Sequence, residues 1–401
     1  MPTPPPDERR CFILPPSELE RRWALTRALM REHGLDALVV QGANNITGVG
    51  GHYAWFTGLS AAGSYPQTAV FFANEPMTVV RHGAFGATAE YNPAAPETYG
   101  IAHYVGTPTF PSVNYTLPYD AGLVAQALRK AHARKVGLVS PGTMYAGFLE
   151  ALRREADSFV LSDFTDVIDE PKAIKSEIEI DLIRKAAAMQ DRTLAELPRL
   201  IQPGMKDCEV MAEANRIGQS IGSETGFFLG SSFTWGDRTP AIRYRSDQGR
   251  VIREGDIFAF LAENAGPGGM YVHMTRFICL GKVPSELEDA IATAVEAQDH
   301  TVSLMTPGAS SADVFKEFNS YMRKRGLDEE ARLHAHGQGY DVVERPLIRN
   351  DETMTIKAGM NIGVHPVVAT KNVVATNCDN YMIFENGSER LHKSKREIVV
   401  P

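Results

Sequence analysis

Few cysteines, no long apolar segment and no excess of positive charge mark this 401-residue sequence. The four cysteines, at positions 11, 208, 279 and 378, have no paired spacing, so we expect no disulfide framework and a reducing, cytoplasmic location. The apolar runs, such as the one from Ile257 to Ala262, are far shorter than the roughly 20 residues that a membrane-spanning helix needs. The first ten residues contain no apolar run and no cleavage signal, so they do not resemble a secretory peptide.

Acidic side chains outnumber basic ones. The 49 Asp and Glu residues against 41 Lys and Arg residues give a formal net charge of -8. Nucleic acids and anionic membranes both favour a basic surface on a binding protein, so the sequence predicts neither as a partner. The composition, with 43% hydrophobic and 22% charged residues, is typical of a globular protein.

The chain is longer than a single hydrophobic core usually becomes, so two domains are expected. After a proline-rich arm at residues 1–15, Ser17 is placed to cap a helix with apolar residues at helical spacing up to Met30. Strand-like and helical segments then alternate, which is typical of a small α/β domain ending at residue 166. These segments are strands at 37–40, 68–72, 77–81 and 136–138 and a helix at 121–133.

A second domain, residues 167–401, is predicted from a change of pattern. A segment interrupted by Pro171 leads from Ile168 into a long helix with Ile180 and Ile183 in its apolar stripe. The rest of this domain contains an internal repeat, because Leu200-Ile-Gln-Pro-Gly-Met matches Leu304-Met-Thr-Pro-Gly-Ala.

An amphipathic helix follows each Pro-Gly of the repeat, and a further glycine, Gly255 or Gly359, follows at the same separation in both copies. Helix, Pro-Gly, helix and hairpin, twice over, predict two packed α+β halves related by a pseudo-two-fold axis.

The repeat and the segment that starts at Glu170-Pro-Lys-Ala-Ile-Lys resemble the peptidase M24, or creatinase–aminopeptidase, superfamily. The likeness covers roughly residues 20–395 and implies an α+β pita-bread domain preceded by a smaller α/β domain, as in creatinase and prolidase. It also implies an enzyme that forms a homodimer, with the N-terminal domain contributing to the partner's site. The segments that follow the family's order are Gly255-Asp256-Ile257, Met274-Thr275-Arg276, His336-Gly337-Gln338-Gly339, Gly359-Met360 and Asp379-Asn-Tyr-Met-Ile-Phe-Glu-Asn-Gly387.

The resemblance also locates a group of polar residues that differs from the family's usual one. Its metallopeptidases hold two metal ions with two Asp, one His and two Glu side chains. The corresponding positions here are Ala262, His273, His336, His365 and Cys378. Bridging between two metals needs carboxylate oxygens, so neither a dinuclear site nor ordinary peptidase activity is expected.

Two interpretations of these residues stay open. In the first, His273, His336, His365 and Cys378 hold one divalent metal ion, with zinc or iron as candidates, because imidazole and thiolate ligands suit such metals. In the second, no metal is bound, and the three histidines act as acid–base groups, as the resemblance to creatinase implies. Glu263 is the carboxylate next to the lost aspartate position and is a candidate general base.

Other residues are candidates for contact with the substrate. Arg243 and Tyr244 precede the Gly-Asp segment, and an arginine there would favour a substrate that carries a carboxylate. Glu344 is either a substrate contact or the ion-pair partner of Arg345 or Arg349.

A glycine-rich loop at residues 44–58 is dense in aromatic side chains. Tyr53, Trp55 and Phe56 form either an aromatic wall for a cationic or aromatic substrate or a small core cluster. The glycines do not follow a strand–helix fingerprint with a later acidic partner, so no nucleotide cofactor is expected.

Together these features predict a hydrolase that cleaves a C–N bond of a small, polar, non-peptide substrate, similar to creatinase or ectoine hydrolase. One alternative is a metal-dependent lyase or another non-peptidase enzyme on the same fold. Another is a binding protein that has kept the fold and lost catalysis.

Overall fold

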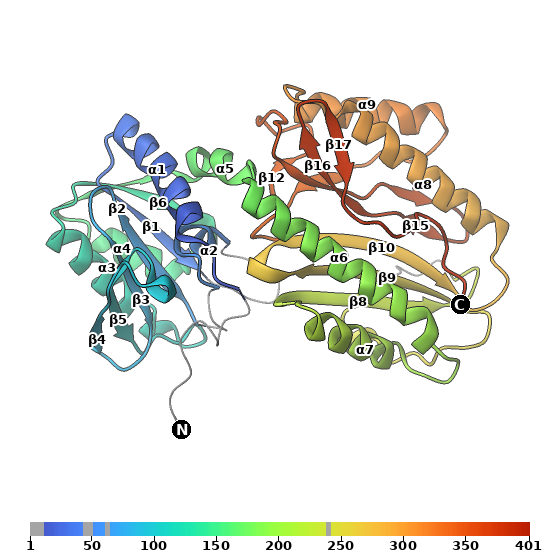
Figure 1. Ribbon diagram of the computed structural model, residues 1–401, viewed down its shortest axis with the longest axis horizontal. Helices are drawn as coiled ribbons and strands as arrows, with labels where there is room; N and C mark the ends of the chain where they lie inside the picture. The colour runs from blue at the N-terminus through green and yellow to red at the C-terminus, as the bar shows by residue number, and fades with distance from the viewer. Residues whose placement is uncertain (1–11, 43–50, 61–64, 238–241) are drawn as a thin grey trace. The chain divides into compact units, whose positions relative to one another are not determined.

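Figure 1 shows the computed structural model, which describes residues 12–42, 51–60, 65–237 and 242–401. The chain forms two compact units, Met1–Lys172 and Ala173–Pro401. The predicted boundary after residue 166 falls within helix α5 (Thr165–Ala173). Most of the proline-rich arm and the first part of the glycine-rich loop lie outside the described residues. Within these ranges, no helix is both long and apolar enough to cross a membrane.

The N-terminal unit contains a seven-stranded mixed sheet with the strand order β4-β5-β3-β2-β1-β6-β7. All strands predicted for this unit are present, and the sequence patterns missed β4, β5 and β7. Strand β5 runs parallel to β3, β6 runs parallel to β1, and β7 runs parallel to β6. In the middle of the sheet, β2 is antiparallel to both β1 and β3. The strands are β1 (Ala37–Gly42), β2 (Gln67–Phe72), β3 (Met77–His82), β4 (Thr88–Glu90), β5 (Ile101–Thr107), β6 (Lys135–Val139) and β7 (Val160–Asp163).

Helices cover both faces of this sheet (Figure 1). Val39 and Val70 belong to a core cluster with α3 (Pro118–Lys130) and α4 (Ala146–Arg154). On the other face, Phe71 contacts Trp23 of α1 (Pro16–His33) and Phe56 of α2 (Gly51–Thr57). Both faces are buried, which explains why β1 reads as a continuous apolar run instead of alternating with polar residues.

Helix α1 begins two residues earlier than predicted, and its first turn has no side-chain cap. The predicted cap, Ser17, lies inside the helix. Pro16 takes the first helical position because its fixed φ suits the helix and its missing N–H would have had no partner there.

The long helix predicted after the segment with Pro171 is α6 (Glu177–Leu200), but most of that segment is itself helical, because it belongs to α5. The chain between them is extended, and Lys175 donates its backbone N–H to the carbonyl of Gly359. Ser176 then starts α6 with a capping box in which its hydroxyl and the carboxylate of Glu179 each accept a backbone N–H. The predicted extended segment is therefore limited to the few residues before α6 that this contact and cap hold.

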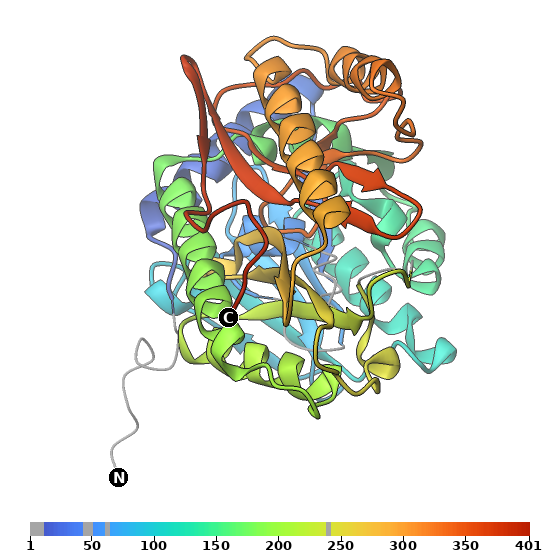
Figure 2. The ribbon, with the colours of Figure 1, turned by 90° about the vertical axis from the view of Figure 1, so that its right-hand side faces the viewer.

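The C-terminal unit repeats a helix pair followed by strands. Helices α6 and α7 (Asp207–Ser220) precede a three-stranded sheet, and α8 (Ser285–Leu304) and α9 (Ser311–Lys324) precede a five-stranded sheet. Figure 2 shows the long helices α6 (green) and α8 (orange) outside the strands of this unit. The strands are β8 (Thr225–Phe233), β9 (Ile257–Ala265), β10 (Tyr271–Cys279), β11 (Ala335–Gly337), β12 (Glu344–Leu347), β13 (Asn361–Val364), β16 (Asp379–Phe384) and β17 (Gly387–Arg390), with a separate ribbon of β14 (Val367–Ala369) and β15 (Val374–Thr376).

Matching backbone hydrogen bonds occur in the two copies of the repeat. Gly204 donates to the carbonyl of Ile252 at 2.8 Å, and Gly308 donates to the carbonyl of Ile356 at the same distance. The residue after each Pro-Gly accepts a bond in return, at 2.8 Å in the first copy and 2.9 Å in the second. The repeat in the sequence therefore corresponds to a repeated local structure.

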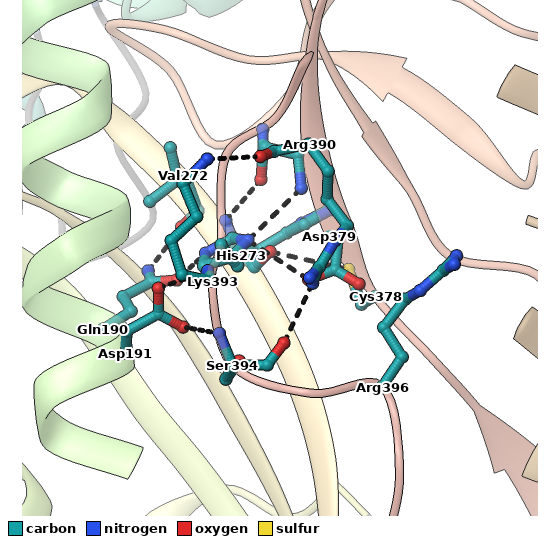
Figure 3. Close-up of polar contacts among 12 residues, drawn as sticks. Gln190, Asp191, Val272, His273, Cys378, Asp379, Arg390, Lys393, Ser394 and Arg396 are labelled. Atoms are coloured by element: carbon teal, nitrogen blue, oxygen red, sulfur yellow. Dashed lines mark hydrogen bonds and ion pairs between the residues drawn. The ribbon is translucent and has the colours of Figure 1, made fainter. Parts of the chain in front are cut away.

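A buried ion pair joins the two halves of this unit. On β10, Arg276 donates to Oδ1 of Asp379, at the start of β16, at 2.7 Å, and the two side chains are 1% and 0% exposed. Beside it, the N–H of Thr275 donates to the carbonyl of Cys378. Figure 3 shows Asp379 at the centre of this region, with Arg390 and Ser394 close by.

The charge of Asp379 is stabilised by its surroundings. Burial by itself raises the pKa of this carboxyl, but Arg276 and His392 outweigh burial and hold the pKa well below its usual range. Asn377 also donates to the second oxygen of Asp379 at 2.9 Å. Asp379 is therefore ionised at neutral pH and fully hydrogen-bonded to its neighbours.

Replacing Arg276 with methionine tests how strongly this pair stabilises the protein. We expect the Arg276→Met variant to lose about 3–5 kcal/mol of unfolding free energy, because it leaves a buried carboxylate without its main partner. The matched control is Arg184→Met, since Arg184 pairs with Glu389 while the side chains are 45% and 31% exposed. Such an exposed pair contributes at most about 1 kcal/mol. Urea titrations followed by circular dichroism measure the unfolding free energies of both variants. Equal losses in the two variants would contradict the central role of Arg276.

The stabilisation by Asp379 should depend on pH. Its folded-state pKa lies below the unfolded value of about 3.9, so it stabilises the fold above that pH and loses this contribution as the pH falls through the folded pKa. Without Arg276, the buried carboxyl takes up a proton at a higher pH. We therefore expect the difference in unfolding free energy between wild type and Arg276→Met to shrink between about pH 7 and about pH 4. A difference that grows on acidification would argue against this assignment.

Candidate active site

Three histidines come together in the C-terminal unit. His273 lies on β10, His336 on β11, and His365 directly follows β13. One ring nitrogen of each lies within 4.8 Å of those of the other two. The ring centroids are 5.0 Å apart for His273 and His336, 5.4 Å for His273 and His365, and 5.2 Å for His336 and His365. The structure thus brings together the three histidines predicted from the sequence.

The ring of His336 is held in one tautomer. Its Nδ1 lies 2.9 Å from the carbonyl oxygen of Gly337, which can only accept, so Nδ1 carries the proton. Nε2 therefore keeps a free lone pair. Burial, followed by the neighbouring ring of His273, lowers the pKa of His336 to about 4, so the ring is neutral at pH 7.

His273 has one ring nitrogen in a polar contact and one without a partner. Nδ1 lies 3.3 Å from Oε1 of Glu263 and 3.5 Å from the amide nitrogen of Gln338. Nε2 is buried and has no hydrogen-bond partner. It lies so close to Gly363 that a Cβ on that residue would be 2.2 Å away. A buried polar atom without a partner is costly, so this nitrogen is a candidate for a ligand atom.

His365 is the most accessible of the three histidines, since it is only partly buried whereas His273 and His336 are buried. Burial of its ring, with His336 and His273 adding to the effect, lowers the pKa of His365 well below its usual value. This imidazole is neutral at pH 7 and can offer a lone pair.

Glu263 lies on β9, directly opposite His273 in the strand pairing. Its side chain is 15% exposed, so it contacts both the buried imidazole and solvent. Its Oε1 lies within ion-pair distance of one of the three rings, that of His273. This position suits the predicted role of a general base.

A chain of buried amides supports His273 from behind. Oδ1 of Asn380 accepts the backbone N–H of His273 at 2.8 Å. The other end of this amide must therefore donate, and it does so to Gln338 and to Asn361, both at 3.0 Å. Because Gln338 accepts with its oxygen, its amide nitrogen faces Nδ1 of His273. We did not predict these three roles from the sequence, although Gln338 lies two residues after His336.

The structure corrects the assignment of Cys378 as a fourth metal ligand. Its thiol is buried and directed at the backbone carbonyl of His273, at 3.8 Å, and it is not part of the three-histidine group. Burial, with the charge of Asp379 adding to it, raises the pKa of Cys378 well above its usual value, so the thiol stays protonated. Cys378 sits beside Thr275 in an isolated bridge, which turns it toward the β10 backbone. Figure 3 shows Cys378 and His273 in this region.

Glu344 has a different partner from those expected. It forms an ion pair of 2.8 Å with Lys175, and both side chains are at most 4% exposed. The expected partners Arg345 and Arg349 instead pair with Glu352 and Asp351. The ion-pair partner is therefore Lys175, and contact of Glu344 with substrate remains a prediction.

The predicted pocket residues Arg243 and Tyr244 lie outside the three-histidine group. Arg243 is partly buried, and Tyr244 is 66% exposed. In the part of the chain that the structure describes, neither side chain has a recorded contact with the three imidazoles. Their contact with substrate remains a prediction.

Tyr53, Trp55 and Phe56 are fully buried in the core of the N-terminal unit. Trp55 packs edge-on against Phe56 at 5.1 Å, and Phe56 packs against Phe71. The hydroxyl of Tyr53 donates to Gln67 at 2.9 Å. The core-cluster interpretation therefore describes them, and the aromatic-wall interpretation is wrong for these buried rings.

Comparison with known proteins places this arrangement in a family. The model described as metallopeptidase family M24 matches residues 181–387. The Xaa-Pro dipeptidase of Pyrococcus horikoshii is 26% identical over 265 residues, which is 63% of this chain and 72% of the dipeptidase. The ectoine hydrolase of Halomonas elongata is 24% identical over 411 residues, 95% of this chain and 96% of the hydrolase.

A solved Xaa-Pro dipeptidase from Bacillus anthracis shares the fold, with a TM-score of 0.74 and 16% identity over 96% of this chain and 100% of that one. The predicted fold, a pita-bread domain after an α/β domain, is thereby confirmed, as is the expected kinship with hydrolases that act on C–N bonds. The family model matches just over half of the residues of this chain, and the chain therefore belongs to metallopeptidase family M24.

Proposed function

We propose that this protein hydrolyses a C–N bond in a small, polar, non-peptide substrate and that His273, His336 and His365 hold one divalent metal ion, zinc or iron. The observation that carries the proposal is the group of three imidazoles with ring nitrogens within 4.8 Å of one another. The similarity to dipeptidases and to an ectoine hydrolase supplies the reaction class.

The residues of the group fit a single metal ion. His336 has a free Nε2 lone pair, and His273 has a buried nitrogen without a partner. Neutral imidazoles are good ligands for zinc and iron. When bound in such a site, a divalent metal ion supplies an activated water at neutral pH. With Ala262 in place of one aspartate and Cys378 directed at the backbone, the chain lacks the carboxylates for a second ion.

Other residues near the group have separate roles. Glu263 accepts a hydrogen bond from His273 Nδ1–H and, being partly exposed, can exchange protons with a substrate. Asn380 fixes the backbone position of His273, and Gln338 accepts a hydrogen bond from the amide of Asn380. His365, the most accessible imidazole, is the first that a substrate would meet.

Two observations favour a non-peptide substrate. The carboxylates that hold two metal ions in the family's peptidases are replaced here by alanine, histidine and cysteine. The similarity to the ectoine hydrolase also extends over nearly the whole chain, whereas that to the Pyrococcus horikoshii dipeptidase covers 63% of it.

A second candidate mechanism is hydrolysis without a metal, with the same histidines as acid–base groups. The contact between Glu263 and His273 supports it, because a carboxylate beside an imidazole is a common arrangement for moving a proton. The substrate class is the same in both mechanisms. A homodimer and a cytoplasmic location also remain proposals.

Metal content separates the two mechanisms. We expect protein purified without chelator to contain about one zinc or iron ion per chain, by elemental analysis, and His365→Ala to lose it. His33→Ala is the matched control, because His33 is an exposed histidine of the N-terminal unit. Wild-type protein that holds no metal even after reconstitution would eliminate the first mechanism and leave the acid–base one.

Replacing Glu263 tests the reaction itself. We expect wild-type protein to release amine or carboxylate products from ectoine-like or creatine-like substrates, and chromatography measures these products. The Glu263→Gln variant should release them about 10²–10⁴-fold more slowly. Glu254→Gln, an exposed glutamate ahead of β9, should keep wild-type activity. Cleavage of Xaa-Pro dipeptides alone would contradict the proposed substrate class, and full activity of Glu263→Gln would contradict its role.

A further inference from the structure

We propose that the N-terminal unit carries a binding site for a small aromatic monocarboxylate, built around Arg27. The site is made of residues of this unit alone and does not depend on the proposed function. It occupies a cavity of about 450 Å³ between α1 and the residues around the β2–β3 turn and before β5. This size suits a small ligand, since ligand pockets usually measure roughly 300–1,000 Å³.

Aromatic side chains form a fixed wall of the cavity. Trp23 stacks on Tyr99 with ring centroids 5.7 Å apart and planes 10° from parallel. Trp23 donates its Nε1–H to the carbonyl of Phe56 at 2.7 Å, which holds the indole in place. It also lies directly over Gly100, where a Cβ would be 2.1 Å from the ring and φ is +73°. A side chain at that position would displace Trp23, so this wall requires glycine.

Arg27 is a cation without a counter-ion in this cavity. Its guanidinium lies over the ring of Phe71, 4.9 Å from the centroid. Its Nε is buried without a hydrogen-bond partner, and no ion pair to Arg27 is present among the described residues. Glu20, which also lines the cavity, accepts the hydroxyl of Tyr99 instead. Burial lowers the pKa of Arg27, and no neighbouring carboxylate offsets this effect.

A partly buried guanidinium with unused donors is costly, and an anion would satisfy it. Arginine binds carboxylates through two parallel hydrogen bonds because its planar fork matches the two oxygens. Tyr99 and Pro93, which line the cavity and are partly exposed, would contact a flat apolar body attached to that carboxylate. Glu20 and the exposed Glu75 would repel an ion with several negative charges, so a monocarboxylate fits better than a phosphate.

Benzoate is a suitable probe, and the Nε1–H signal of Trp23 in a ¹H–¹⁵N NMR spectrum reports binding in the cavity. We expect benzoate to shift this signal saturably and to leave that of Trp235, in the C-terminal unit, unchanged. Arg27→Met should weaken benzoate binding about tenfold or more, the effect of losing a charged hydrogen bond. Arg129→Met is the matched control, since Arg129 pairs with Glu155 on the surface of the same unit while both are 44% exposed.

Two further ligands and one further variant sharpen the test. Benzamide has the same shape as benzoate without the charge, and it should bind at least about tenfold more weakly than benzoate. Inorganic phosphate should also bind at least about tenfold more weakly than benzoate. Arg27→Lys keeps the charge without the planar fork and should bind benzoate with an affinity between those of wild type and Arg27→Met. Equal affinity of wild type and folded Arg27→Met for benzoate, or no shift of the Trp23 signal at saturating benzoate, would overturn the proposal.

Discussion

The buried pair of Arg276 and Asp379 connects the two halves of the C-terminal unit, and the three-histidine group depends on it. Arg276 lies three residues after His273 on β10, and Asp379 begins β16, next to the asparagine that holds the His273 backbone. Arg276 also donates to the carbonyl of Lys395, so the end of the chain is tied to the same place. If the two strands shifted, the support for His273 would shift with them.

Neutral ligands change what such a site can bind. In the family's dinuclear peptidases, several carboxylates offset the charge of two metal ions. Here burial keeps His336 and His365 uncharged, and among the described residues Glu263 is the carboxylate in contact with the group, through His273. A group with little negative charge favours one ion over two, because a second divalent cation nearby would be repelled without being compensated. This electrostatic difference is the basis of the proposed single-metal site.

The sequence predicted the fold well where patterns repeat. Pro203-Gly204 and Pro307-Gly308 marked the two halves, and the order of family segments identified the three histidines that the structure brings together. Short elements such as β4 and β7 were missed, because partly exposed strands of three or four residues show no clear periodicity. Helix α5 was also missed, and the short extended stretch after it depends on a contact with Gly359, far away in the sequence.

What the sequence by itself determined is therefore the architecture and the chemical type of the residues at the site. Apolar periodicity and the internal repeat can be recognised in the sequence without knowing which residues each segment contacts in the folded protein. Only the tertiary structure decided which partners each side chain meets: Cys378 turns to a backbone carbonyl, Glu344 meets Lys175, and Arg27 meets no carboxylate in the described residues. Burial and pairing come from elements far apart in the chain, so composition and spacing cannot fix them.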